Sequence, residues 1–182
     1  MRYFLMICQK RTVIAVLCLL VTVACSGCGA LGKDFRYIDE PFYAEACGRM
    51  GDRDVSVSVF CDPTSYGEEV YKKLTVTFFA PEELKGMTVD LFSDGSGSLR
   101  LGNIEGGDCD FCGIAEPFLI FCPEGDISSV KKEKDGRVVT FGEGEGRVWY
   151  FFGGDGGLKR IEGAARGEKI LLNVTNFYII GK

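Results

Sequence analysis

Apolar residues that alternate with polar ones, in short runs separated by glycine-rich turns, limit this chain more than any other feature of its sequence. Over residues 54–61, three valines and a cysteine fall on one face and two serines fall on the other. The same period of two recurs over residues 70–79 and 87–91, and more weakly over 98–104. This pattern is typical of antiparallel β-strands that bury one face of a sheet.

The second half of the chain continues the pattern with tighter turns. Residues 138–141 and 147–152 flank the sequence Gly-Glu-Gly-Glu-Gly, which predicts a hairpin, and residues 170–180 supply a final strand. The apolar run 116–123, EPFLIFCP, is either a helical turn or a buried strand, and residues 34–50 show a weak amphipathic helix. We expect a mainly β (α+β) fold with about eight to ten strands in an antiparallel meander and one or two short helices.

Length and composition narrow the class of protein. The 182 residues suit one folded domain, and a hydrophobic content of 46% is enough to bury a core. There is no histidine, which removes the commonest general base and every zinc site that uses imidazole. With 26 acidic against 21 basic side chains, a nucleic-acid partner is not expected. We expect a non-enzymatic protein with no cofactor and no bound metal.

The N-terminus has the pattern of an export signal. Arg2, Lys10 and Arg11 precede thirteen residues without a charge, 12–24, whereas a helix that spans a bilayer needs about 20 apolar residues. Small residues before a cysteine close this run and resemble the lipobox of bacterial lipoproteins, in which that cysteine is acylated. Ala24 and acceptable upstream residues precede Cys25, whereas Cys28 has Cys25 where the pattern wants an aliphatic residue, so Cys25 fits better than Cys28. An uncleaved signal anchor and ordinary secretion are the alternatives.

This interpretation divides the chain into a signal peptide (1–24), a lipidated tether (25–40) and one β-rich domain (41–182). Removal of residues 1–24 takes away three basic side chains and no acidic ones, so the net charge falls from −5 to −8. We therefore expect the membrane to be the partner of this chain, bound through the lipid on the cysteine and not through electrostatic attraction. We expect the protein on the extracytoplasmic face of the cell membrane.

Cysteine usage leaves three interpretations open. If Cys25 is acylated, six cysteines remain, an even number that suits disulfides in an exported protein. The compact motif Cys109-Asp-Phe-Cys112, with Cys122 further on, also allows a thiol-redox or a metal site, which we consider less favoured. The candidate disulfide cysteines are Cys28, Cys47, Cys61, Cys109, Cys112 and Cys122.

One longer pattern resembles a known family. Residues 74–91, LTVTFFAPEELKGMTVDL, are followed by GRVVTF at 136–141, GLKRI at 157–161 and LNVTNF at 172–177. This order is similar to that of small lipoproteins of Gram-positive bacteria whose domain resembles the Lol-type lipoprotein carriers and their receptor. The resemblance covers residues 41–178 and implies a strongly curved meander that forms an incomplete barrel around an apolar cavity.

The expected function is to bind a hydrophobic ligand, such as an acyl chain, or a lipidated protein. Residues 148–152 are large and apolar on both faces, so this strand either lies within a two-layer core or lines a cavity. A structural or protein-interaction module at the cell envelope, with an envelope protein as partner, is the alternative function. The candidate cavity residues are Leu74, Val76, Phe78, Val89, Leu91, Trp149 and Phe151.

Overall fold

The computed structural model describes residues 40–62, 72–107, 113–123, 127–165 and 167–181, and residues 36–182 make up one compact unit. Within the described ranges the chain forms eleven strands and three short 3-10 helices. The strands of the first half are β1 (Phe42–Met50), β2 (Arg53–Cys61), β3 (Lys72–Ala80), β4 (Met87–Phe92), β5 (Gly97–Leu101) and β6 (Ile104–Gly107). Those of the second half are β7 (Ile127–Glu133), β8 (Gly136–Phe141), β9 (Val148–Gly153), β10 (Leu158–Ala165) and β11 (Glu168–Ile179). The helices are η3 (Glu82–Leu84), η5 (Glu116–Phe121) and η6 (Gly144–Gly146).

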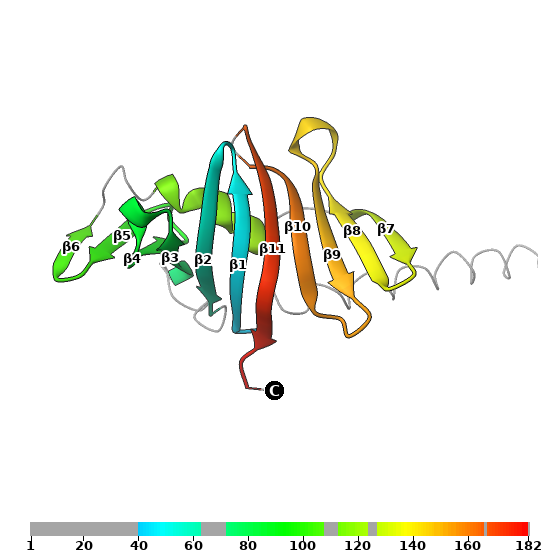
Figure 1. Cartoon of the computed structure of the whole chain (residues 1–182), viewed down its shortest axis with the longest axis horizontal. Coiled ribbons are helices and arrows are strands. Elements are labelled where there is room, and N and C mark those ends of the chain that lie inside the picture. Colours follow the sequence, from blue (N-terminus) through cyan, green and yellow to red (C-terminus); the bar gives the residue numbers. More distant parts are fainter. Residues whose placement is uncertain (1–39, 63–71, 108–112, 124–126, 166, 182) are drawn as a thin grey trace, which may run out of the picture. The chain divides into compact units, whose positions relative to one another are not determined.

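All eleven strands belong to one antiparallel sheet with the order β6-β5-β4-β3-β2-β1-β11-β10-β9-β8-β7 (Figure 1). The chain runs outward from β1 to the edge strand β6, crosses to the opposite edge at β7, and returns to β11 beside β1. The expected antiparallel meander is therefore confirmed. It consists of a first meander, β1–β6, and a second meander, β7–β11, which meet at the β1–β11 pair. The sheet is open, with β6 and β7 as its edges, and it is not strongly curled, in contrast to the strongly curved incomplete barrel that we expected.

Local patterns located some elements and missed others. The hairpin of β8 and β9 and the final strand β11 lie where the sequence predicted them. The run 116–123 is helical over η5 and not a buried strand. β1 replaces the weak amphipathic helix expected over residues 34–50, because its apolar residues alternate onto a buried face, and β7 was not predicted because most of its side chains are exposed.

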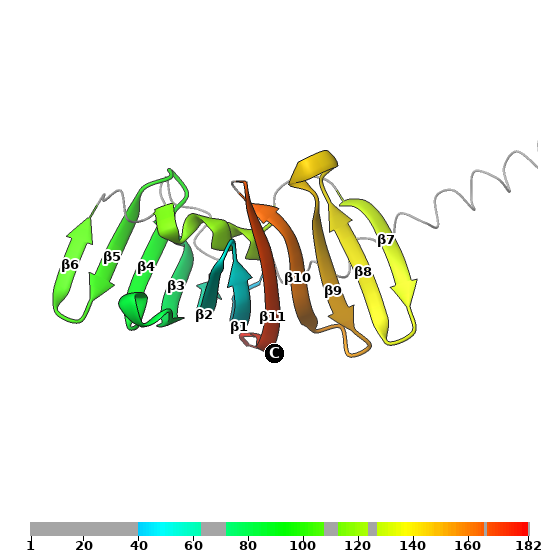
Figure 2. The same ribbon diagram turned by 45° about the horizontal axis from the view of Figure 1, so that its top comes forward.

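The two faces of the sheet differ, because η5 crosses only one of them (Figure 2). We call this the covered face and the opposite one the open face. Phe118 of η5 meets Phe78 of β3 edge to face, with ring centroids 5.6 Å apart. The covered face carries the apolar residues of the alternating strands, and its fully buried members include Phe42, Val57, Val59, Leu74, Val76 and Ile161. Burial of these side chains is the main stabilising contribution to the fold.

On the open face the strands carry polar pairs. Thr75 donates a hydrogen bond to the carboxylate of Asp90, with 2.6 Å between the two oxygens, and Arg100 approaches the same carboxylate at 3.7 Å. Thr77 and Thr88 are also bonded across β3 and β4, at 3.1 Å. Cross-strand pairs of this kind stabilise the sheet without an apolar layer above it. In the part of the chain that the structure describes, no helix has the length and apolarity needed to cross a bilayer.

Gly48 allows the central strands to approach closely. It lies in β1 opposite Leu172 of β11 and Val55 of β2. A Cβ atom at this position would overlap the backbone carbonyl oxygen of Leu171, which cannot move without disturbing the β1–β11 pairing. A side chain at this point would therefore act directly on the junction of the two meanders.

We predict that Gly48→Ala lowers the free energy of unfolding by about 1–3 kcal/mol, the usual effect of overpacking. The matched control is Gly106→Ala in the edge strand β6, where an added Cβ has no neighbour within 4 Å. The control is expected to stay within about 0.5 kcal/mol of the wild-type value. Urea unfolding followed by far-ultraviolet circular dichroism measures both, and equal effects of the two substitutions would contradict the role given to Gly48.

Candidate functional site

An apolar crevice lies between η5 and the strands β8, β9 and β10 on the covered face. Its volume is about 340 Å³, which is at the lower end of the range for small-molecule sites. Lys73, Glu116 and Gly142 contribute polar or backbone atoms to it. The apolar part of the lining comes from Pro117, Leu119, Ile120, Cys122, Pro123, Phe141, Val148, Tyr150, Ala164 and Ala165.

The sequence of η5 explains how it forms one wall of this crevice. Pro117 stands at its start, where a missing N–H is tolerated, and the helix is a single 3-10 segment of six residues. Phe118 and Phe121 are buried and fix the helix to the sheet. Leu119 is only half-buried, and it lines the crevice. The short apolar run therefore supplies both the anchors and the wall.

Tyr150 of β9 holds the middle of η5. Its hydroxyl donates a hydrogen bond of 2.8 Å to the backbone carbonyl of Ile120, and its ring packs edge to face on Phe141 at 5.5 Å between centroids. The side chain is 1% exposed, and this burial is the main cause that raises the pKa of Tyr150 above its usual value. The phenol therefore stays neutral and serves as a hydrogen-bond donor.

Two thiols lie at the end of η5. Cys122 follows its last residue, and its Sγ donates to the Sγ of Cys61 in β2 at a distance of 3.7 Å. Cys61 in turn donates to the backbone carbonyl of Lys73 at 3.1 Å. The hydrogen bond from Cys122 is the main cause that lowers the pKa of the Cys61 thiol, against the opposing effect of burial.

The structure separates the seven predicted cavity residues into two groups. Leu74, Val76, Phe78, Val89 and Leu91 lie together on the covered face and are at most 5% exposed, but they do not line the crevice. Trp149 and Phe151 lie on the open face, where the guanidinium of Arg160 sits 3.9 Å from the centre of the Phe151 ring. The seven residues therefore do not share one cavity, because alternation in β9 sends Tyr150, and not its neighbours, toward η5.

The predicted cysteine sites are only partly visible. Cys25, Cys28, Cys109 and Cys112 lie outside the described residues. Cys47 is exposed on the open face of β1, where it lies opposite Asn173 and Ser56. Among the described residues, no group of three or more Cys, Asp or Glu side chains is placed to hold a metal ion.

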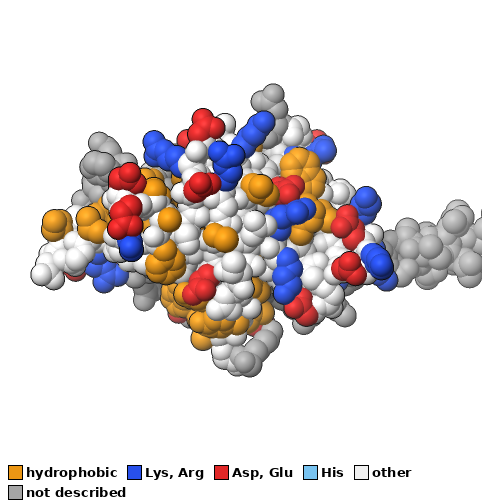
Figure 3. Space-filling model, in the orientation of Figure 1, with side chains coloured by type: hydrophobic (Ala, Val, Ile, Leu, Met, Phe, Trp, Pro, Cys, Tyr) orange, Lys and Arg blue, Asp and Glu red, His pale blue; other side chains and the backbone are white. Residues whose placement is uncertain are grey.

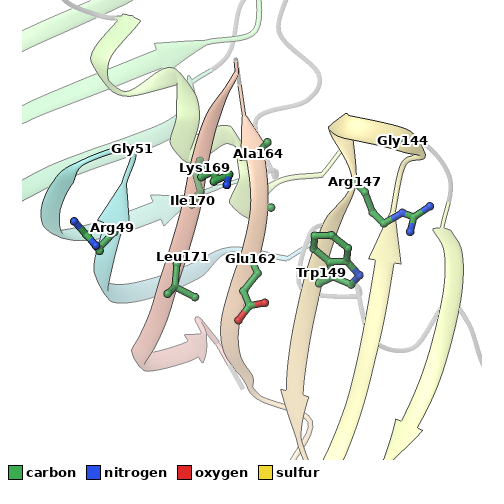
Figure 4. Close-up of a pocket in the computed structure, with 11 residues that line it drawn as sticks. Arg49, Gly51, Gly144, Arg147, Trp149, Glu162, Ala164, Lys169, Ile170 and Leu171 are labelled. Atoms are coloured by element: carbon green, nitrogen blue, oxygen red, sulfur yellow. The ribbon is translucent and has the colours of Figure 1, made fainter.

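The open face has a groove of its own, of about 620 Å³ (Figure 4). Trp149 and Leu171 provide its apolar surface, and Arg49, Arg147 and Glu162 stand around them. The Trp149 and Leu171 side chains are 36% and 41% exposed. A second hollow, between β7, β8 and β9, shares Arg147 and Trp149 with the groove. Hydrophobic side chains elsewhere on this face form separate patches among charged ones (Figure 3).

Sequence reasoning missed Leu119, Phe141 and Tyr150 as lining residues. Two signals were present: the apolar run at 116–121 and the strand 148–152 with large residues on both faces. The sequence did not show which of these two segments would meet, because η5 and β9 come together only through the fold. The site is thus an apolar crevice with a neutral phenol in its floor, on a single open sheet.

Comparisons with known proteins add little to this description. No family model matches the chain, and no curated protein matches it significantly. Among solved structures, the crystal structure of an uncharacterized conserved protein from Thermus thermophilus is similar to it, with 13% sequence identity and a TM-score of 0.49. That match covers 85% of this chain and 87% of the other. The class defined by the fold and the site is a mainly β domain built on one antiparallel sheet of two joined meanders, with a partly covered apolar face.

The raised pKa of Tyr150 predicts a specific loss of stability in alkali. The contribution of Tyr150 to the free energy of unfolding is fully present below the pKa of an unfolded tyrosine, about 10. It is lost as the pH rises above that value, because only the unfolded chain then releases the phenol proton. Wild-type stability should fall by up to about 1.4 kcal/mol per pH unit from this group above pH 10. Tyr150→Phe should remove this component, and it should cost about 1 kcal/mol at pH 8 through loss of the hydrogen bond.

Urea unfolding at a series of pH values between 8 and 11 measures these effects. Leu171→Gln, which changes an exposed side chain that carries no titratable group, is the control and should keep the wild-type alkaline slope. If Tyr150→Phe and wild type lose stability in parallel above pH 10, the buried phenol is not the group responsible.

Proposed function

We propose that this chain is a non-enzymatic lipoprotein, anchored through Cys25 to the extracytoplasmic face of a bacterial cell membrane. We propose further that its β-domain binds an acyl chain, free or carried by a lipidated protein, in the crevice beside η5. The leader pattern of residues 1–24 supports the anchor. The crevice supports the ligand class, and it is the observation that carries the proposal.

The lining of the crevice favours a slender apolar ligand. Leu119, Val148 and Phe141 offer hydrocarbon or ring surface from three different elements. Polar groups are few, as is usual for sites that bind apolar molecules by burial of surface. A volume of about 340 Å³ suits a single chain and not a bulky polycyclic ligand. Lys73 of β3 also lines the crevice, and its backbone carbonyl accepts the hydrogen bond of Cys61.

The resemblance to the Lol-type carriers supports this proposal through a shared plan, in which one apolar face of an antiparallel meander is partly covered by a helical segment. In that family the sheet is implied to curl into an incomplete barrel that encloses the ligand. Here we place the ligand beside η5, at the margin of the covered face, because the centre of that face is filled by fully buried side chains such as Val76 and Phe78.

Binding of a fatty acid tests the crevice directly. Residues 36–182 form one compact unit, so this fragment is suitable for titration with a fluorescent fatty-acid analogue. Leu119→Gln places an amide in the crevice and should weaken binding about tenfold, which corresponds to about 1.4 kcal/mol. The matched control, Leu171→Gln, changes an exposed leucine on the open face and should leave the affinity unchanged.

Each result has a definite meaning. A loss of binding in Leu119→Gln alone supports the crevice. A loss in Leu171→Gln alone would move the ligand to the open-face groove, and no saturable binding by the wild-type fragment would overturn the proposed ligand class. Circular dichroism spectra of the three proteins must coincide for this comparison.

Metabolic labelling tests the anchor separately. We expect the full chain, expressed in a bacterium grown with an alkyne-tagged fatty acid, to carry the label. Cys25→Ser should abolish the labelling, whereas Cys28→Ser, three residues further on, should retain it. Labelling lost only in Cys28→Ser would assign the anchor to the second cysteine, and an unlabelled wild-type chain would overturn the lipoprotein assignment.

A protein-interaction module at the cell envelope is the second candidate function. The observation that favours it is the open-face groove, where Trp149 and Leu171 are exposed between Arg49 and Arg147. Aromatic and arginine side chains are enriched at the centres of protein interfaces. The two substitutions at Leu119 and Leu171 also separate this function from ligand binding. A thiol-redox or metal function centred on Cys109, Cys112 and Cys122 stays the third candidate.

A further inference from the structure

The paired thiols Cys61 and Cys122 join parts of the molecule that are distant in the sequence. They are 61 residues apart in the chain, and Cys61 ends β2 while Cys122 follows η5. Both side chains are buried, with exposures of 2% and 8%. Their sulfur atoms are 3.7 Å apart, so they already face one another across the covered face.

The distance between the two sulfurs suits a covalent bond. A disulfide holds its sulfurs about 2.05 Å apart, so these two sulfurs need to approach by only ~1.6 Å more for the bond to form. Cys47 is the other described cysteine, and its position in β1 places it on the open face. Within the described residues, Cys61 and Cys122 are therefore the pair that the fold brings together.

We propose that Cys61 and Cys122 form a disulfide in the exported protein, and that this bond fixes the C-terminal end of η5 and with it one wall of the crevice. This inference rests on export, one part of the proposed function, and it does not depend on the ligand. Exported proteins keep disulfides, because their compartment lacks the reducing systems of the cytosol.

The chemistry is exchange with an external disulfide, carried by an oxidoreductase or by an oxidised small thiol. One cysteine, as the thiolate, attacks a sulfur of that disulfide and releases one thiolate, which leaves a mixed disulfide. The second cysteine then attacks the protein sulfur of the mixed disulfide, forms the Cys61–Cys122 bond and releases the second thiolate. The protein loses two electrons and two protons, and the oxidant is reduced to two thiols.

Burial orders these events. An external disulfide cannot reach sulfurs that are almost fully buried, so oxidation takes place before η5 docks or when η5 opens. Once formed, the bond is protected from reductants by the same burial. In the folded, reduced protein, both thiols should react with iodoacetamide far more slowly than the exposed Cys47.

Thiol mapping of the full chain is the decisive experiment. The chain is exported from a bacterial host, unfolded without reductant, alkylated with iodoacetamide and digested. We expect mass spectrometry to find one cross-linked peptide pair that contains Cys61 and Cys122, two hydrogens lighter than the separate peptides, while Cys47 is alkylated. Alkylated Cys61 and Cys122, or bonds from either of them to Cys109 or Cys112, would overturn the proposal.

Thermal unfolding tests what the bond does. A cross-link that closes a loop of this length should raise Tm by about 5–10 °C, so reductant should lower the Tm of the wild-type protein by that amount. Cys61→Ser and Cys122→Ser should be insensitive to reductant, and Cys47→Ser should keep the wild-type response. A wild-type Tm that does not change with complete reduction would contradict the stabilising role.

The two proposals fail separately. Thiol mapping uses the wild-type chain and involves no ligand, so it gives an answer even if a cysteine variant does not fold. Titration of the oxidised and the reduced fragment with a fatty acid then tests whether the disulfide affects ligand binding. If the bond holds the crevice wall, reduction should weaken binding severalfold, and equal affinities would show that η5 keeps its position without the bond.

Discussion

Backbone pairing between β1 and β11 is the interaction on which the rest of this structure depends. Every other neighbouring pair of strands in the sheet consists of elements consecutive in the chain, whereas this one joins the first strand to the last. All residues of β1, from Phe42 to Met50, have partners on β11, with one irregularity between Glu45 and Ala46. Without these hydrogen bonds the chain would hold two separate meanders, each with one more exposed edge strand, which is a known route to aggregation. The absence of a side chain at Gly48 permits the close approach that the pairing requires.

The sequence was sufficient for the class of fold and insufficient for its curvature and its edges. Strict alternation located β2, β3 and β4, because these strands carry apolar side chains on one face and mostly polar ones on the other. β1 was not predicted because Gly48 and small alanines weaken its apolar pattern. β7 was not predicted because it is an edge strand with exposed residues such as Lys131 and Glu133, and it has little apolar face. Sheet curvature depends on twist and bulges accumulated over many strands, which period-two patterns do not encode.

The candidate site was harder to predict than the fold, for a reason that β9 makes clear. Trp149 and Phe151 alternate with Tyr150, and all three are large enough to line a cavity. Periodicity states that neighbours in a strand point to opposite faces, but it does not state which face will be covered. The position of η5 determines which face is covered. This helix belongs to a different part of the chain, and the carbonyl of its Ile120 accepts the hydrogen bond of Tyr150. Of the aromatic residues left on the other face, Trp149 lines the open-face groove, and Trp149 and Phe151 both line the neighbouring hollow.

The short helix η5 repeats, on the covered face, the joining role that β1 and β11 have within the sheet. Six residues of 3-10 helix have little stability of their own, so tertiary contacts must hold η5 in place. Phe118 contacts Phe78, and Cys122 contacts Cys61, both in the first meander. Ile120 accepts the hydrogen bond of Tyr150 in the second meander. The crevice lies where η5 passes over the second meander, and the contacts of η5 to the first meander help to hold its wall in place. A covalent bond at Cys122 would make one of those contacts permanent, and this is the physical reason to expect that oxidation and ligand binding are coupled.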